Sequence, residues 1–184
     1  MSSPIAHCSL LLAFWPAARR SLAAGTTRRR WLIGAAILFA LMAPDLDAVM
    51  GPLVGTSIAS YHNGPTHSLM VAMAFGMLFG LVCKTFWPAD LRALVLLGAA
   101  AYTSHILLDW LSWGPGVLLL WPFLPDTRFA SPVPLFLGVR HSVNAPWTTH
   151  LLTVANDSAF AIVVWIVSRT IARRGRTAPS NSGG

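Results

Sequence analysis

The chain has 184 residues, enough for one domain, and its composition is that of a membrane protein. Hydrophobic residues make up 55% of it and charged residues only 10%, against roughly 25% charged residues in soluble domains. With one lysine and no glutamate, a soluble protein of this size could not cover its surface, so lipid must cover much of it. The net charge of +7 invites a nucleic-acid interpretation, but the arginines flank apolar runs as cytoplasmic anchors do. We therefore expect a membrane-lipid environment and no nucleic-acid partner.

Five apolar segments are predicted to be helices, so the expected fold is an all-α integral membrane bundle of four to five helices. Two of them, 67–87 and 91–113, approach the roughly 20 residues that cross a bilayer. The first two are shorter, so either could be tilted, re-entrant or packed inside the bundle. The predicted helices are residues 5–18 (closed by Pro16 and two arginines), 31–43, 67–87, 91–113 and 148–170.

The segments between these helices are predicted from their turn-forming residues. Residues 48–66 are rich in Gly, Pro, Ser and Thr and are expected to form a loop. Residues 114–149 are expected to be a longer non-helical stretch, whose tryptophans are typical of a membrane–water interface. A single membrane-embedded domain is expected over residues 1–174, followed by a disordered polar tail at 175–184.

The arginines also predict the orientation of the helices. Five of them lie within residues 19–30 and four more within 169–176, which places both segments in the cytoplasm. The N-terminus is then outside and the C-terminus cytoplasmic, while Arg128 and Arg140 fall outside against the trend. With the exception of Asp90, this topology places every histidine and aspartate on the outer side of the membrane.

The spacing of these polar residues predicts a metal site. His105 and Asp109 are four residues apart on one predicted helix, so they share a face and could bind one ion. They interrupt an apolar run, where an ionisable residue is costly and by default marks a site or a paired interior group. Asp45 and Asp47 follow Pro44, and in an extended backbone both carboxylates would point to one side.

A Gly-Pro turn brings His62 and His67 to the start of the next predicted helix, with Thr66 as the expected N-cap. The N-terminus of that helix would favour an anion such as phosphate. Mixed His and Asp ligands suit zinc or another borderline divalent ion. Such a metal lowers the pKa of its bound water to about 7, and a spare aspartate could then act as general base.

Three motifs in the chain resemble those of a known family. PDLD at 44–47, H-x-G-P-T-H-S at 62–68 and H-x-x-x-D-W at 105–110 are similar to motifs of the LexA-binding, inner-membrane-associated metal-dependent hydrolases (YdjM-like). The likeness covers about residues 5–170 and implies a bacterial inner-membrane protein. That family is similar in turn to zinc-dependent phospholipase C, which uses a His, an Asp, a His and an H-x-x-x-D pair in this order. Carried over by position, the resemblance implies as metal ligands His7, Asp45, His62 or His67, His105 and Asp109.

Two positions depart from the pattern of the family. Asn63 stands where an arginine is usual, and that arginine would be a natural partner of a phosphate group. Val154 stands where the relatives have the aspartate of a second H-x-x-x-D, counted here from His150, and Asp157 lies further on. We therefore expect one or two divalent ions rather than three, with zinc favoured.

The predicted function is metal-dependent hydrolysis of a small-molecule or lipid phosphoester at the extracytoplasmic face of the inner membrane. Asp47 and Asp109 are the expected catalytic residues. The main alternative is a non-enzymatic membrane protein, in which the same residues form a structural metal site or bind a partner. A metal or proton carrier is the third, but a relay needs polar residues on both sides of the bilayer, and the inner halves of these helices offer almost none.

Overall fold

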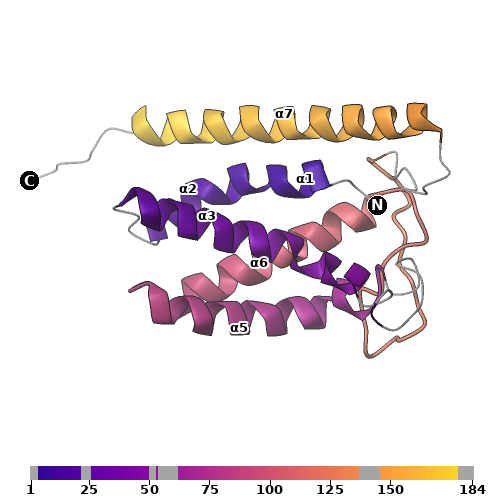
Figure 1. Cartoon of the computed structure of the whole chain (residues 1–184), viewed down its shortest axis with the longest axis horizontal. Coiled ribbons are helices and arrows are strands. Elements are labelled where there is room, and N and C mark those ends of the chain that lie inside the picture. Colours follow the sequence, from indigo (N-terminus) through magenta and orange to yellow (C-terminus); the bar gives the residue numbers. More distant parts are fainter. Residues whose placement is uncertain (1–3, 22–25, 50–52, 54–61, 137–145, 178–184) are drawn as a thin grey trace, which may run out of the picture.

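The computed structural model describes residues 4–21, 26–49, 53, 62–136 and 146–177 (Figure 1). Within these residues the fold is all-α, as predicted, and contains no β-strand. Figure 1 shows the long helices lying side by side along one axis, with α7 forming one outer layer of the bundle. The helices are α1 (Pro4–Ser9), α2 (Leu11–Ser21), α3 (Thr27–Met42), α5 (Leu69–Phe86), α6 (Leu91–Trp110) and α7 (Trp147–Thr177), with the 3₁₀ segments η1 (Ala43–Val49) and η3 (Pro65–His67).

Among the described residues, four helical segments are long and apolar enough to cross a membrane: Thr27–Ala48, Leu69–Phe86, Leu91–Trp110 and Trp147–Arg173. The first of them is longer than predicted, because the chain stays helical past Pro44 in the tighter 3₁₀ form of η1. The last is the least buried, with 11% of its apolar window inside the protein. It packs mainly against α1 and α2.

The N-terminal apolar segment differs from the single helix predicted over residues 5–18. The helix is interrupted at Leu10, whose backbone N–H donates to the carbonyl of His7 at 3.2 Å. Helix α2 begins at the next residue. Pro16 lies inside α2 rather than closing a helix. Its ring removes one intrahelical hydrogen bond without ending the helix. The prediction of a helix closed by Pro16 was therefore wrong.

Side-chain caps fix where three of the helices begin. Ser68, Asp90 and Thr26 precede α5, α6 and α3, and each accepts a hydrogen bond from the backbone N–H three residues further on, at 3.3, 2.9 and 3.3 Å. Thr66 had been predicted to cap α5, which was wrong because Ser68 performs that role. The hydroxyl of Thr66 is consequently available for another partner.

Helices α5 and α6 approach each other closely along a seam of glycines. A β-carbon at Gly76 would lie 2.6 Å from that of Ala99, and one at Gly80 would lie 2.4 Å from Val95 Cγ2. Small residues that let backbones approach are a general device for packing helices in membranes. The seam holds the start of α5 against the last turns of α6, where polar side chains lie.

The non-helical stretch after α6 is confirmed over its described part. Residues 111–136 form a coil with two isolated bridges, Ser112 to Phe136 and Val117 to Phe129. Gly116 has a φ of +83°, and a β-carbon there would lie 2.5 Å from the carbonyl oxygen of Phe129, so the turn requires glycine. This coil covers one end of the bundle (Figure 1).

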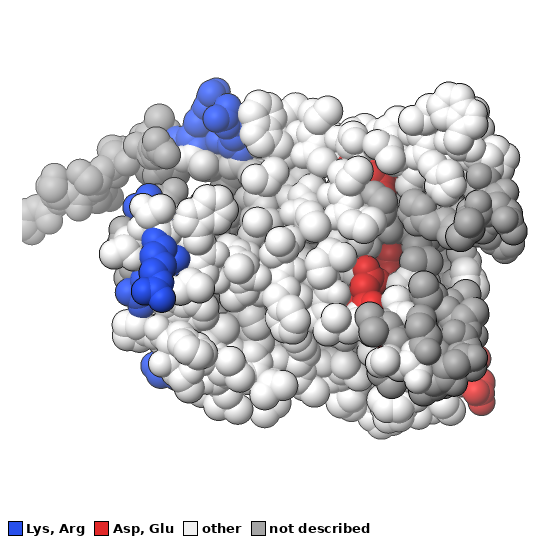
Figure 2. Space-filling model, viewed as in Figure 1, with Lys and Arg blue, Asp and Glu red and all other residues white. Residues whose placement is uncertain are grey.

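Helix α7 continues to Thr177, three residues into the segment predicted to be a disordered tail. Residues 178–184 lie outside the described residues, as do most of the predicted loop 48–66 and Arg140. On the face that Figure 2 shows, lysine and arginine gather at one end of the bundle and aspartate is exposed towards the other.

We predict that Gly80→Ala destabilises the protein. The added methyl group would overlap Val95 Cγ2 and lie 2.9 Å from the Val95 backbone nitrogen, so α5 and α6 must separate, at a cost of about 1–3 kcal/mol. Thermal unfolding in detergent should show a lower midpoint. Gly34→Ala is the matched control, since its β-carbon would meet only the Trp15 ring at 3.7 Å. Equal midpoints for the two variants would contradict the seam.

Candidate metal centre

Buried polar side chains from five parts of the chain collect at one end of the bundle. They come from α1, η1, the turn before η3, η3 itself and the last turns of α6. Most of these side chains are buried, and Asp45 is the most exposed at 27% of its side-chain surface. The residues brought together are His7, Asp45, Asp47, His62, His67, His105 and Asp109.

Four of them form what we call the primary group: Asp45, His67, His105 and Asp109. Each offers one ligand atom, and these atoms lie within 4.8 Å of one another. Asp45 Oδ1 is 3.2 Å from His105 Nε2 and 3.8 Å from His67 Nε2, while Asp109 Oδ2 is 3.5 and 3.2 Å from the same two nitrogens. Ligands about 2.0–2.1 Å from a tetrahedral ion stand about 3.3 Å apart. The primary group therefore has the spacing of ligands around one divalent ion.

Several of these ligand atoms are buried without a hydrogen bond. Asp45 Oδ1 and the Nε2 atoms of His62, His67 and His105 have no hydrogen-bond partner. Buried polar atoms are nearly always paired, because an unpaired one loses its hydration without compensation. Three of these atoms, Asp45 Oδ1 and the Nε2 atoms of His67 and His105, belong to residues of the primary group, whose spacing suits one cation. The burial, chemical type and spacing of these ligand atoms therefore fit a bound divalent metal ion.

The orientation of His105 is fixed from the far side of its ring. His105 Nδ1 lies 2.6 Å from the carbonyl oxygen of Leu41 and donates to it. In the 3₁₀ pattern that follows α3, this carbonyl would accept from residue 44, but Pro44 has no N–H to give. The proline therefore leaves an acceptor that His105 satisfies. With its proton on Nδ1, the ring presents the lone pair of Nε2 to the primary group.

Asp47 contacts the far sides of two other rings. Its Oδ1 lies 2.9 Å from His62 Nδ1, and its Oδ2 lies 3.2 Å from His67 Nδ1 and accepts the hydroxyl of Thr66 at 2.6 Å. Both Nε2 atoms then face Asp45, at 3.7 and 3.8 Å. A carboxylate that binds the outer nitrogen of a ligating histidine fixes its tautomer and orientation. This arrangement supports an orienting role for Asp47, and its predicted catalytic role stays a prediction.

Asp47, His62 and His67 form a second group whose ligand atoms also lie within 4.8 Å of one another. Burial acts to lower the pKa of His67, but the nearby carboxylates of Asp109 and Asp47 outweigh it and raise the pKa. A proton or a metal ion can therefore provide the positive charge that these carboxylates require.

His7 lies beside the primary group but does not belong to it. Its Nε2 is 3.4 Å from Asp109 Oδ1, and its ring stacks on His105 with 3.7 Å between centroids. Helix α1 thus delivers a buried imidazole to the opposite oxygen of Asp109. Its role as a metal ligand stays a prediction.

A model of the family described as YdjM inner membrane protein matches residues 3–176. The chain belongs to the YdjM inner membrane protein family. No curated protein and no solved structure matched the chain. The family match and the four apolar helices make this YdjM protein an inner-membrane protein. LexA binding and likeness to zinc-dependent phospholipase C stay predictions.

Two residues of this YdjM protein, Tyr102 and Arg128, support the site although no sequence pattern predicted this role. Tyr102 donates its hydroxyl to the carbonyl of Thr66 at 2.8 Å. Arg128, considered above only as a contrary charge, donates to the carbonyls of Asn63 and Gly116 at 3.2 and 3.1 Å. These bonds tie the turn that carries both histidines to α6 and to the coil. No motif marks them, because each joins segments distant in the chain.

The structure shows where the residues that depart from the family pattern lie. Asn63 is buried and has a φ of +59°, a left-handed conformation that asparagine adopts more readily than most residues. His150 and Asp157 lie on α7, and Asp157 is buried. Within the described part of the chain, neither belongs to a group of ligand atoms.

Asp47→Asn is predicted to weaken metal binding. An amide cannot accept hydrogen bonds from both rings and from Thr66, so His62 and His67 should lose their fixed orientation and zinc affinity should fall about 10–100-fold. Competition with a chromogenic chelator would measure the dissociation constant of zinc. Asp126→Asn is the matched control, since Asp126 is exposed in the coil. Unchanged zinc affinity in Asp47→Asn would contradict an orienting role.

Proposed function

We propose that this family member is a membrane-bound, metal-dependent hydrolase that cleaves a phosphoester, with zinc as the favoured ion. The observation that carries the proposal is the set of buried atoms without hydrogen bonds: Asp45 Oδ1 and the Nε2 atoms of His67 and His105. Nitrogen and oxygen ligands together match zinc better than magnesium or calcium, which prefer oxygen alone. Asp109 completes the primary group.

A divalent ion held by the primary group would supply a water activated at neutral pH. Two histidine ligands of this ion are oriented by other residues. The Leu41 carbonyl orients His105, and Asp47 orients His67. Asp109 lies 3.2 Å from His67 Nε2 through one oxygen and 3.4 Å from His7 through the other. Of the two aspartates predicted to be catalytic, Asp109 belongs to the primary group and would hold the ion, whereas Asp47 contacts the outer nitrogen of His67.

The exposure of Asp45 favours an enzyme over a structural metal site. Structural zinc sites are closed by four protein ligands, whereas catalytic sites keep a position open or take a fifth ligand during the reaction. With four protein ligands in the primary group, hydrolysis would need such a fifth position. Asp45 retains 27% exposure of its side chain while His67 and His105 have none. Asp45 Oδ1 itself is buried, so a substrate would reach the primary group past the exposed part of the Asp45 side chain.

The surroundings of Asp45 favour a lipid phosphoester as substrate. Its neighbour Leu46 is 54% exposed, and Phe39, nearly two turns earlier, is 55% exposed. On a membrane protein such apolar surface faces lipid. A phospholipid could bring its phosphate to Asp45 while its chains stay against this surface, whereas a soluble phosphoester gains nothing from it.

The outer face of the inner membrane is the proposed location of the site. Arg28, Arg29 and Arg30 lie at the start of α3, and Asp45 lies beyond its end. Since arginine clusters favour the cytoplasm, the primary group would lie on the extracytoplasmic side and the C-terminus in the cytoplasm.

Asp109→Asn should abolish phosphoester hydrolysis by the zinc-loaded protein. Loss of this ligand is expected to lower kcat/KM by at least about a hundredfold, because the activated water would be lost with the ion. Release of phosphate or alcohol from a soluble phosphodiester and from a phospholipid in mixed micelles would measure it, with the phospholipid cleaved faster. Asp90→Asn, at the opposite end of the bundle, is the control. Bound zinc without hydrolysis of either substrate would instead indicate a structural site.

The orientation predicts the behaviour of reporters fused after residue 184. A fluorescent protein that matures only in the cytoplasm should fluoresce, and alkaline phosphatase, active only outside, should be silent. The opposite pair of signals would place the site in the cytoplasm.

A further inference from the structure

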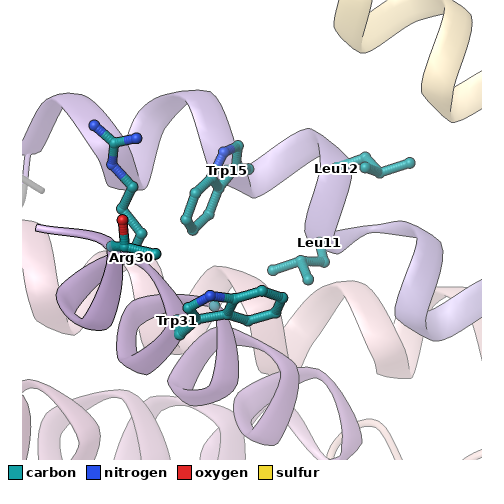
Figure 3. A pocket seen from close by; sticks show the side chains of 7 residues that line it. Leu11, Leu12, Trp15, Arg30 and Trp31 are labelled. Carbon is teal, nitrogen blue, oxygen red and sulfur yellow. The ribbon is translucent and has the colours of Figure 1, made fainter.

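A groove unrelated to the metal centre lies between α2 and α3, at the basic end of the bundle (Figure 3). Its volume is about 360 Å³, within the range of about 300–1,000 Å³ typical of ligand pockets. The accessible lining is apolar. Leu11, Leu12 and Trp15 contribute to it from α2, and Trp31 and Gly34 from α3.

Gly34 keeps the groove open. The nearest atom to a β-carbon there would be on the Trp15 ring, at 3.7 Å, so the position has room that no neighbouring side chain fills. Trp31 is 78% exposed and lies along the side of the groove in Figure 3. Because α3 belongs to a membrane-spanning segment, what meets this apolar surface in the bilayer is lipid.

The rim of the groove is positively charged. Arg30 lines it, and Arg28 and Arg29 precede it in the first turn of α3. Figure 2 shows the basic residues gathered at this end of the molecule. Among the described residues, the acidic side chain near this end of the helices is Asp90. Its carboxylate is engaged in capping α6. The local field therefore attracts an anion.

We propose that the groove binds an anionic phospholipid, with one acyl chain between Trp15 and Trp31 and the phosphate group against Arg28–Arg30. A membrane lipid is the molecule that carries a long apolar chain next to a negative group at this depth. Basic pockets between membrane helices bind anionic headgroups, and tryptophans are enriched at the level of the headgroups. This site is independent of the metal centre and of hydrolysis.

Quenching of tryptophan fluorescence by brominated lipid would test the proposal. The full chain is reconstituted with phosphatidylcholine that contains a small fraction of either brominated phosphatidylglycerol or brominated phosphatidylcholine with the same chains. Brominated phosphatidylglycerol should quench at least about threefold more strongly per mole fraction. A Trp15→Phe/Trp31→Phe variant should lose this excess, because none of its remaining tryptophans lines the groove.

Two variants and their matched controls distinguish binding in the groove from unspecific attraction of anionic lipid to the basic end of the bundle. Arg30→Gln should remove most of the excess quenching, whereas Arg92→Gln, which loses the same charge at the same end, should keep it. Gly34→Leu should fill the groove and remove the excess, whereas Ala35→Leu, on the exposed side of α3, should not. Equal quenching by the two lipids would overturn the proposal, as would equal losses in Arg30→Gln and Arg92→Gln.

Discussion

The hydrogen bond from His105 Nδ1 to the carbonyl of Leu41 joins the end of α3 to the end of α6, and the candidate centre is built around it. It exists because Pro44 removes the N–H that this carbonyl would otherwise accept in the 3₁₀ pattern. One residue later, Asp45 places its carboxylate 3.2 Å from the other nitrogen of the same ring. A single proline thus ends the regular helix, creates the acceptor that orients a histidine, and delivers the carboxylate which that histidine faces.

The close packing of α5 and α6 supplies the second half of the arrangement. Gly76 and Gly80 leave no room for side chains between these helices, so the turn before α5 lies against the last turns of α6. His67 is thereby carried to within 3.2 Å of Asp109. Two aspartates in an apolar bundle would be costly if isolated, since a buried charge is tolerated only when paired or bound to a metal. Their shared histidines offset part of that cost, and a divalent ion held between them would offset more of it.

Much of this could be predicted from the sequence, and the failures have physical reasons. The apolar runs predicted the membrane helices, and the i, i+4 spacing placed His105 and Asp109 on one helix face. Local rules failed where tertiary contacts compete: Thr66 is a good N-cap by type, but it donates to Asp47, and Ser68 caps α5 instead. The orienting contacts of Asp47 and Arg128 could not be predicted, because they depend on how distant segments pack and no local pattern records that.

Helix α7 has a different relation to the bundle. It rests mainly on α1 and α2, and its membrane-spanning window is only 11% buried. Every residue of both ligand groups precedes it in the chain. Since a chain is synthesised from its N-terminus, all of these ligand residues leave the ribosome before the last helix does. The final span is thus an addition to a centre whose ligands it does not supply, and sequence changes on its lipid-facing side can accumulate without touching either ligand group.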